Sequence, residues 1–431
     1  MKKNYLIYLF LLVLCVSCSS SQSDARVYDS VVDINGTGDF TSLQQAIDSM
    51  PSGRTAPWLI FVKNGRYEEL IRVPAEKSFI HLIGQDKDNV IITYKINCAN
   101  PENENDSGRE FSRITMGEKN CATMVVSSSD FYAENISFEN SWGVEEKSGP
   151  QALALRMEGD RSAFYNCRFR SFQDTWMTST KGLNDRTYAT DCWIEGAVDY
   201  FYGGGNAYVE NSTFYNVRSG SVIVAPSHKE GTKWGYIFNN CIVDGNQAAA
   251  DGKSKLGRPW HHGPIAVYMN TTIKIPLHPE GWTDMGPAAK LFAEYNSRDA
   301  DGNPVDLSQR RTWYKQSAGE GGKKIEGLKA ILNSEDVAEY TYENIIEGDD
   351  NWNPKAFFEK IVKPANLQLA SNGSLSWSAD TDAIGYIIYG DDEVIGFSDS
   401  NSYKSDKKAE SYTVQAVNKY GSLGEMSDRV N

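Results

Sequence analysis

The chain has 431 residues, of which 40% are hydrophobic and 23% are charged, an ordinary composition for a globular protein that is long enough for more than one domain. Its formal net charge of −14 argues against nucleic-acid binding, which needs a basic surface. The same charge repels an anionic polymer at long range, so an acidic substrate requires a locally basic groove.

The N-terminus has the features of an export signal. Two lysines precede a short apolar run at residues 5–16, which is too short to span a membrane. Ser17 and Cys18 follow, and this pattern resembles a bacterial lipoprotein signal in which Cys18 becomes the lipidated first residue; a plain secretory signal is the alternative. We expect a signal at 1–18, a tether at 19–30, and an exported protein that touches the outer membrane, on its periplasmic or surface side, only through its lipid.

One short helix is predicted near the start of the mature chain. Thr41 or Ser42 is placed to cap it, and Pro51 ends it. Its apolar face recurs with helical spacing and consists of Leu43, Ala46, Ile47 and Met50. From residue 58 onward the helical period is lost, and short β-rich runs alternate with turns.

A loose repeat then follows. Four-residue segments that start with asparagine or aspartate begin at positions 135, 166, 191, 211, 240 and 270, so that successive starts are 20 to 31 residues apart. A β-rich unit at this period indicates a solenoid whose rungs stack around a continuous core. We therefore predict a parallel β-helix; a two-sheet sandwich is the alternative, but its strands would not normally share a signature at this spacing.

The repeat makes a geometric prediction about two carboxylates. Asp174 lies eight residues after Asn166, and Asp199 lies eight residues after Asp191. Equal offsets in adjacent rungs place both carboxylates on one face, about 4.8 Å of stacking apart.

Five cysteines remain after the signal, without a C-x-x-C pair, so zinc and redox motifs are not indicated. Cys167 and Cys192 occupy the same place in adjacent rungs. They can form a rung-to-rung disulfide or fill the core as two buried thiols, and the sequence leaves both open.

The last part of the chain has a different character. We place the end of the first domain, 31–362, shortly after Trp352-Asn-Pro354. Residues 363–431 contain short alternating strands and resemble a small fibronectin type III-like β-sandwich, although the segment is short for that fold. Such modules are more often binding or spacer units than catalytic ones.

Four polar motifs between residues 151 and 260 carry candidate functional side chains. They are Gln151-Ala-Leu-Ala-Leu-Arg156, Gln173-Asp174-Thr175, Gly196-Ala-Val-Asp199-Tyr200 and Leu256-Gly-Arg258-Pro-Trp260. Taken singly, these residues could be internal amides, turn aspartates or a surface ion-pair partner. Their collection in neighbouring rungs favours a single site with ester-cleaving chemistry.

Together with Gly65-Arg-Tyr-Glu-Glu69, Pro279-Glu-Gly-Trp282 and Ala293-Glu-Tyr-Asn296, these motifs resemble the pectin methylesterase (pectinesterase) family over roughly residues 31–354. The resemblance implies an all-β, right-handed parallel β-helix. It also implies an enzyme that removes methyl esters from galacturonate units of pectin and releases methanol. No cofactor or metal is implied, pectin is the expected partner, and we expect a monomer.

The resemblance also assigns roles. Asp199 is the expected nucleophile, since a carboxylate can attack an ester carbonyl and form a covalent intermediate. Arg258 is expected to brace Asp199 and keep it ionised. Asp174 is expected to donate a proton to the departing methanol and then to accept one from water.

Neutral donors are expected to stabilise the oxyanion, and the family match places Gln151 and Gln173 there. Trp260 offers a flat apolar face to a sugar ring. Tyr200, Phe201 and Trp282 are expected to line the same groove.

The chain departs from the family pattern at several places that we expect to lie near the groove. They are Ser171-Phe172, Trp176, Met285 and Glu118-Lys-Asn120. These departures bear on subsite preference and not on the reaction.

Alternative functions predict different residues. A pectate lyase needs a calcium-binding carboxylate cluster and a basic residue, and a glycoside hydrolase needs carboxylic acids across a glycosidic bond. Neither explains the paired glutamines as well. An esterase for another polysaccharide ester, or a non-catalytic cell-surface glycan binder, remains as the alternative; the binder would tolerate loss of Asp174 or Asp199, and both are present.

Overall fold

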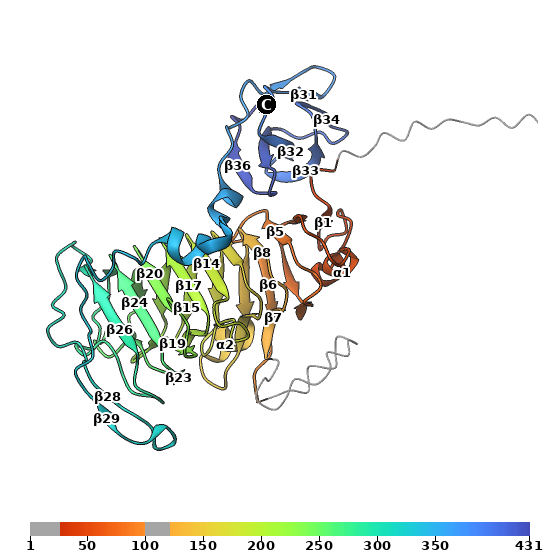
Figure 1. Ribbon diagram of the computed structural model, residues 1–431. Coiled ribbons are helices and arrows are strands. Elements are labelled where there is room, and N and C mark those ends of the chain that lie inside the picture. Colours follow the sequence, from red (N-terminus) through yellow and green to blue (C-terminus); the bar gives the residue numbers. More distant parts are fainter. Residues whose placement is uncertain (1–25, 100–120) are drawn as a thin grey trace, which may run out of the picture.

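The computed structural model describes residues 26–99 and 121–431, and most of this chain forms three long parallel β-sheets (Figure 1). The ten-stranded sheet consists of β1 (Ser30–Val32), β2 (Trp58–Val62), β5 (Ile80–Gly84), β8 (Phe131–Glu134), β11 (Ser162–Tyr165), β14 (Arg186–Thr190), β17 (Asn206–Glu210), β20 (Tyr236–Asn239), β24 (Ile265–Met269) and β26 (Leu291–Tyr295). The eight-stranded sheet consists of β4 (Ile71–Val73), β7 (Ala122–Val126), β10 (Leu153–Met157), β13 (Trp176–Thr178), β16 (Val198–Gly203), β19 (Val222–His228), β22 (Lys255–Gly257) and β23 (His261–His262), which pairs with β19. The nine-stranded sheet consists of β3 (Gly65–Glu68), β6 (Val90–Tyr94), β9 (Ser137–Asn140), β12 (Arg168–Arg170), β15 (Trp193–Gly196), β18 (Thr213–Asn216), β21 (Ile242–Gly245), β25 (Thr272–Ile273) and β27 (Arg298–Asp299).

Successive strands of the chain visit the three sheets in turn, so a complete rung contributes one strand to each sheet, and the rungs at the two ends are incomplete. Each strand pairs in parallel with the equivalent strands of the rungs before and after it; β14, for example, pairs with β11 and with β17. This is the parallel β-helix predicted from the repeat. Its core is a continuous stack of buried apolar and aromatic side chains, which include Phe138, Phe164, Phe169, Phe214 and Phe238.

From β8 onward, the repeated asparagine or aspartate marks one corner of the rung. Asn135, Asn166, Asp191, Asn211 and Asn240 all adopt positive φ angles, between 49° and 56°, where the chain turns from the ten-stranded into the nine-stranded sheet. Asparagine and aspartate tolerate this left-handed conformation better than other non-glycine residues. The side-chain amides also stack, because Asn166 donates to Asn135 (2.6 Å) and Asn240 donates to Asn211 (2.7 Å). The signature is therefore a requirement of the turn.

The predicted helix closes the first end of the core. It is α1 (Leu43–Ser49), and the Ser42 hydroxyl accepts a hydrogen bond from the Gln45 backbone N–H at 3.3 Å. Leu43, Ala46 and Ile47 are fully buried against the first rungs. A second short helix, α2 (Ser141–Glu146), lies between β9 and β10.

Cys167 and Cys192 do not form a disulfide. Cys167 and Cys192 are free, buried thiols, as is Cys241, and each donates to backbone carbonyl oxygens. A disulfide instead joins Cys98 to Cys121.

The C-terminal segment forms two antiparallel sheets. One contains β30 (Gln368–Leu369), β31 (Ser374–Ser376) and β34 (Ser402–Lys404); the other has the order β33 (Glu393–Ser398), β32 (Ala383–Gly390), β35 (Tyr412–Asn418) and β36 (Leu423–Met426). Leu375, Trp377, Ile388 and Val414 are buried between them. The three-stranded and the four-stranded sheet make the expected sandwich, and the strands of the three-stranded sheet are only two or three residues long.

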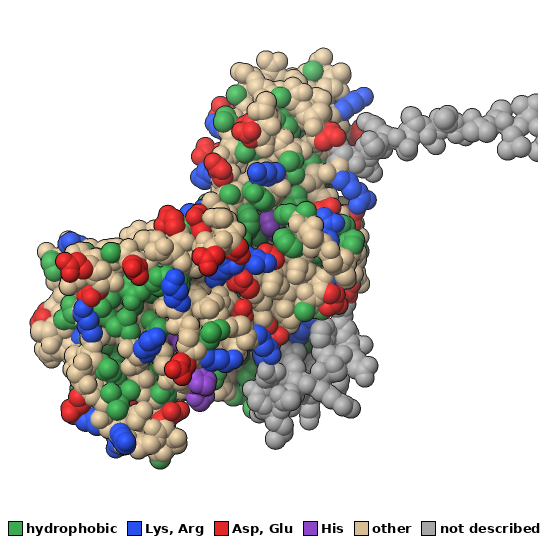
Figure 2. Space-filling view, viewed as in Figure 1, with side chains coloured by type: hydrophobic (Ala, Val, Ile, Leu, Met, Phe, Trp, Pro, Cys, Tyr) green, Lys and Arg blue, Asp and Glu red, His purple; other side chains and the backbone are tan. Residues whose placement is uncertain are grey.

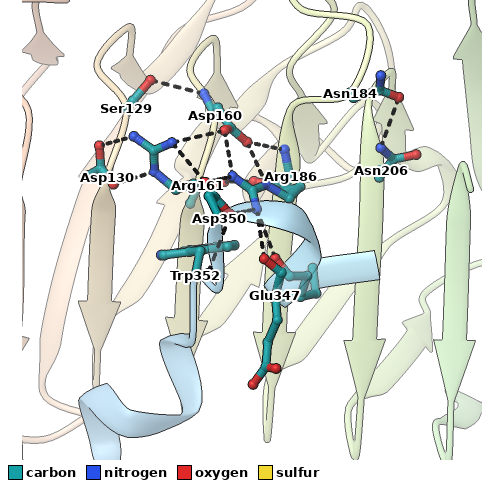
Figure 3. A network of polar contacts seen from close by, with 12 residues as sticks. Ser129, Asp130, Asp160, Arg161, Asn184, Arg186, Asn206, Glu347, Asp350 and Trp352 are labelled. Carbon is teal, nitrogen blue, oxygen red and sulfur yellow. Dashed lines mark hydrogen bonds and ion pairs between the residues drawn. The ribbon is translucent and has the colours of Figure 1, made fainter. Parts of the chain in front are cut away.

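Residues 332–358, here called the strap, cross the outer face of the ten-stranded sheet before the sandwich begins (Figure 1). The strap contains η3 (Glu343–Glu347), η4 (Gly348–Asp350) and η5 (Pro354–Phe358). Arg186 of β14 binds the strap through Asp350, and it also pairs with Asp160 (Figure 3). Beside it, Arg161 pairs with Asp130 in the same network. Before the strap, a hairpin of β28 (Tyr314–Lys315) and β29 (Lys324–Ile325), with η2 (Ala318–Glu320) between the strands, projects from the last rungs.

The sandwich packs on the first rungs of the ten-stranded sheet, where hydrophobic side chains gather at the junction (Figure 2). The Phe397 ring lies 5.7 Å from the ring of Phe61 and 5.9 Å from that of Tyr28. Buried polar groups also cross the junction: the Tyr28 hydroxyl donates to Gly421 O at 2.8 Å, and Glu134 accepts from the Leu423 backbone N–H at 3.4 Å. The two domains therefore share one hydrophobic cluster.

The predicted signal, Cys18 and most of the tether lie outside the described residues. Within 26–99 and 121–431, no helix has the length and apolarity needed to cross a membrane.

Candidate active site

The two predicted carboxylates occupy matching places in neighbouring rungs of the eight-stranded sheet. Gln173 bridges to Val198 in parallel, and the Asp174 backbone N–H donates to the Val198 carbonyl at 2.9 Å. Asp174 and Asp199 both have left-handed backbones, with φ of 62° and 51°. The equal offsets in the repeat therefore correspond to equal backbone turns at the entrance to β13 and at the start of β16.

Asp199 is held by Arg258. The guanidinium donates from Nε to Oδ1 at 2.8 Å and from Nη2 to Oδ2 at 2.5 Å, a two-bond arrangement that fixes the orientation of the carboxylate. Asp199 is 5% exposed, and Arg258 reaches it from the segment directly after β22. The planar fork of arginine suits this geometry, which a lysine could not reproduce.

The surroundings of Asp174 instead favour its protonated form. Burial and, second, the negative charge of Asp199 raise its pKa well above the usual value, while Arg258 and hydrogen bonds with Gln173 and Tyr202 lower it in part. The net effect favours a protonated carboxyl. The site thus combines an arginine-paired carboxylate with a neighbouring carboxyl that tends to hold its proton.

Asp174 lines a groove of about 800 Å³ on the outer face of the eight-stranded sheet, whereas Asp199, Arg258 and Gln173 are not among its lining residues. Gln151, Asp174, Tyr202 and Trp260 all line it. One end is bounded by Pro150 and the Cys98–Cys121 disulfide, and the Cys98 backbone N–H donates to the Gln151 carbonyl at 2.8 Å.

The other end of the groove is basic. Lys181 and Lys229 line it after the C-terminal ends of β13 and β19, while Arg156 lines it from within β10 and His262 from β23. Glu158 lies beside this end, 2.7 Å from Arg156 and 3.8 Å from Lys181. The groove therefore has the locally positive region that a protein of net charge −14 needs if it binds an acidic polymer.

Trp260 stands at the groove wall, as predicted for a sugar-binding ring. It is partly exposed, and its ring lies edge-on to that of Tyr202, with centroids 5.5 Å apart. Gln151 and Gln173 are half-buried, and Gln151 lines the groove.

The prediction that Tyr200, Phe201 and Trp282 line the groove is wrong, since all three are 0% exposed in the β-helix core. The register of β16 against β19 shifts between Val198 and Phe201, so that strict alternation fails there. The residue of this strand that faces the groove is Tyr202, which we did not single out. The unusual backbone at Asp199 is not visible in the sequence, and counting alternately from it gives the wrong faces.

The departures from the family pattern also lie differently from what we expected. Ser171 and Trp176 are buried, with the Ser171 hydroxyl donating to Ala152 O and Trp176 packed in the core. Met285 is 37% exposed and remains the one of these three that a polymer could touch. Residues 118–120 lie outside the described residues.

Comparison with known proteins agrees with this geometry. A sequence profile of the pectinesterase family matches residues 29–349. The chain belongs to the pectinesterase family. It is similar to pectinesterase 31 of Arabidopsis thaliana, with 36% identity over 266 residues that cover 61% of this chain and 80% of that relative.

Two solved pectin methylesterases share the fold. The enzyme from carrot has a TM-score of 0.62 and 24% identity, covering 78% of this chain and 98% of its own. A pectin methylesterase solved in complex with a hexasaccharide has a TM-score of 0.56 and 22% identity, covering 77% of this chain and 99% of its own. The sandwich, from residue 363 onward, lies beyond the family match. In the described parts of the chain, no group of three or more His, Cys, Asp or Glu side chains could hold a metal ion.

Proposed function

We propose that this pectinesterase removes methyl esters from galacturonate units of pectin, with Asp199 as nucleophile and Asp174 as general acid and base. The observation that carries the proposal is the unequal pair of carboxyl groups: Asp199 is braced by Arg258, and Asp174 is partly buried in the groove with a raised pKa. Two carboxyls whose surroundings separate their pKa values are what acid–base catalysis in this form requires.

In the first step, an Asp199 oxygen attacks the ester carbonyl, and the bond to the methoxy group breaks. Asp174 donates its proton to the departing oxygen, methanol leaves, and an anhydride joins the substrate to Asp199. In the second step, Asp174 accepts a proton from water, which attacks the same carbonyl and releases Asp199 as a carboxylate. One water is consumed, and one methanol and one carboxylic acid are formed.

Gln151 and Gln173 are proposed to donate to the oxyanion that forms in both steps. Their amides add no titrating group; Gln151 lines the groove together with Asp174, and Gln173 directly precedes Asp174 in the chain, which supports this role. Loss of one such donor typically lowers turnover by about 10²–10³-fold.

Pectin fits the groove in two respects. Trp260 presents an aromatic ring to a sugar, and the basic end with Lys181 and Lys229 can bind the carboxylates of units that have already lost their methyl groups. The structural relative with a bound hexasaccharide supports an oligosaccharide ligand for this fold.

We also propose that the protein is exported, lipid-anchored at Cys18 on the outer membrane, and monomeric. The disulfide between Cys98 and Cys121 supports an oxidising compartment. Mass spectrometry of the mature protein tests the lipid, and sedimentation tests the oligomeric state; an unmodified Cys18 or a stable dimer would reject the respective statement.

The deciding experiment is methanol release from highly methylated pectin by the wild type, Asp199→Ala and Asp174→Asn. We expect release by the wild type and a loss of at least about 10³-fold in both variants, as removal of a covalent nucleophile or its proton donor entails. Asp191→Asn is the matched control, since it converts the corner residue of the same rung to the asparagine used in other rungs. Full activity of Asp199→Ala would remove Asp199 from its role, and an inactive wild type would favour a glycan-binding protein or an esterase for another ester.

A further inference from the structure

The Cys98–Cys121 disulfide lies at the end of the groove where Gln151 lines it. Cys98 comes shortly after β6, and Cys121 directly precedes β7. The bond therefore joins a segment that leaves the nine-stranded sheet to the start of a strand in the eight-stranded sheet. Both half-cystines belong, with Leu153 of β10, to one apolar cluster beside the groove.

Backbone hydrogen bonds connect both half-cystines to the segment that carries Gln151. The Leu153 N–H donates to the Cys121 carbonyl at 3.0 Å, as a parallel ladder requires where Leu153 pairs with Ala122. Two residues earlier in the chain, the Gln151 carbonyl accepts from the Cys98 N–H at 2.8 Å. In a regular ladder this second donor would be the N–H of Cys121 itself. Cys98 thus extends the edge of β7, and the disulfide ties it to that edge.

The next residue, Ala152, connects the same segment to the rung of Asp174. The Ala152 N–H donates to the Gln173 carbonyl at 3.1 Å, and the Ala152 carbonyl accepts from the Ser171 hydroxyl at 2.5 Å. The backbone at Gln151 is therefore held from two sides, by the rung of Asp174 and by Cys98. Of these two connections, the one through Cys98 reaches the Gln151 carbonyl directly.

Cleavage of the disulfide removes a local restraint and leaves the β-helix in place. Ile96, two residues before Cys98, is 1% exposed, and the strands on both sides keep their ladders. The other cysteines in the described ranges are Cys167, Cys192 and Cys241, which are buried free thiols. A reductant therefore acts, within residues 26–99 and 121–431, on the bond beside Gln151 alone.

We propose that the Cys98–Cys121 disulfide is a positioning element, which holds Gln151 where the oxyanion forms and makes turnover depend on an oxidised bond. The inference rests on the proposed function and extends it. A donor stabilises an oxyanion to the extent that it is fixed at the right place before the reaction. A displacement of about 1 Å in such a site can lower the rate by about 10²-fold. The esterase should therefore lose most of its turnover in a reducing compartment.

The first measurement compares kcat and KM for methanol release before and after treatment with dithiothreitol. The reagent breaks the S–S bond, gives each cysteine sulfur one proton, and closes its own disulfide. Cys98 is partly exposed in the groove, so its sulfur is open to attack. We expect kcat to fall about 10–100-fold, with a much smaller change in KM because the oxyanion exists only after substrate has bound. Reoxidation should restore kcat.

Two variants show whether the loss arises through Gln151. Cys98→Ser/Cys121→Ser should have the low kcat of the reduced wild type and should not respond to dithiothreitol. In Gln151→Ala, where the amide is already absent, reduction should change kcat by less than about 2-fold. Circular dichroism and thermal melts establish that each form is folded at the assay temperature. An unchanged kcat in the reduced wild type, or an equal loss in wild type and Gln151→Ala, would overturn the proposal.

The second measurement does not depend on activity. In protein labelled with ¹⁵N-glutamine, the side-chain amide signal of Gln151, assigned by its absence in Gln151→Ala, should move on reduction. The Cys98 backbone N–H should exchange with deuterium at least about 10-fold faster once the disulfide is cleaved. If neither readout responds, the proposal fails even where activity falls. If the wild type releases no methanol, the proposed function fails by itself, while these readouts still decide whether the disulfide holds Gln151.

Discussion

Glu134 provides a quantitative test of how the two domains are joined. It is buried at the end of β8, accepts hydrogen bonds from the Tyr132 hydroxyl at 2.8 Å and the Asn135 amide at 3.1 Å, and reaches Leu423 of the sandwich. Burial is the main cause that raises its pKa from the ordinary 4.5 to about 6, against the lowering effect of these hydrogen bonds. At about 1.4 kcal/mol per pH unit, this rise corresponds to about 2 kcal/mol.

The sign follows from which state ionises first. Below pH 4.5 the Glu134 carboxyl is protonated in the folded and the unfolded chain, and its titration changes nothing. Between pH 4.5 and about 6 the unfolded chain ionises first, so the free energy of unfolding falls as pH rises, and above about 6 the full 2 kcal/mol or so is lost. Glu134→Gln has no such carboxyl, so its stability relative to the wild type should rise by about 2 kcal/mol between pH 4.5 and 7, whatever its constant offset.

The assay is urea unfolding followed by tryptophan fluorescence at several pH values across this range. His81 lies at the same junction, with Nδ1 3.0 Å from Tyr420 O, and burial lowers its pKa to about 4. Its neutral form is the one that folds, so it destabilises the protein as pH falls below 6.5, with a sign opposite to that of Glu134. The difference between wild type and variant cancels His81, and the exposed Glu425→Gln supplies the background. A difference that is constant with pH, or that shrinks as pH rises, would refute the reasoning.

Two further predictions concern charge. Arg186→Met should lower the free energy of unfolding by about 2 kcal/mol, which is less than the loss of a fully buried pair costs because Asp350 is half exposed. Arg161→Met should cost about 1 kcal/mol. Urea unfolding of both variants measures these costs, and equal costs would contradict the prediction. Replacement of Lys181 and Lys229 by glutamine should raise KM for low-methyl pectin about 3–10-fold at low salt. The increase in KM should be smaller for highly methylated pectin and smaller at high salt. An increase that does not depend on methylation would argue against carboxylate binding at the basic end of the groove.

Much of the fold was predictable because the rung imposes a local requirement. The turn at Asn135, Asn166 and Asn211 needs a residue with a left-handed backbone, so asparagine recurs in the sequence at the spacing of the rungs. The pairing of Asp174 with Asp199 followed from equal offsets within that period. The helix α1 was predictable for the same local reason, since its cap and its apolar face lie within a few residues.

The features that we did not predict correctly depend on residues that are far apart in the sequence. The groove faces of Tyr200 and Phe201 were assigned wrongly because the register shift after Asp199 arises from pairing with β19, some twenty residues later. Tyr202 carried a usable signal, an aromatic residue three positions after Asp199, but only the register shift shows that this position faces out. The Cys98–Cys121 pairing and the basic end of the groove likewise come from residues far apart in the sequence.

The shared hydrophobic cluster between β-helix and sandwich has a consequence for how such chains can evolve. The family match ends at residue 349, yet Phe61 and Tyr28 are covered by side chains that come later, such as Phe397. A gene that lost the sandwich by recombination would leave an aromatic patch open to water and prone to self-association. In this chain the sandwich therefore covers surface that the first rungs would otherwise expose, and its removal or exchange would require the first rungs to change their surface at the same time.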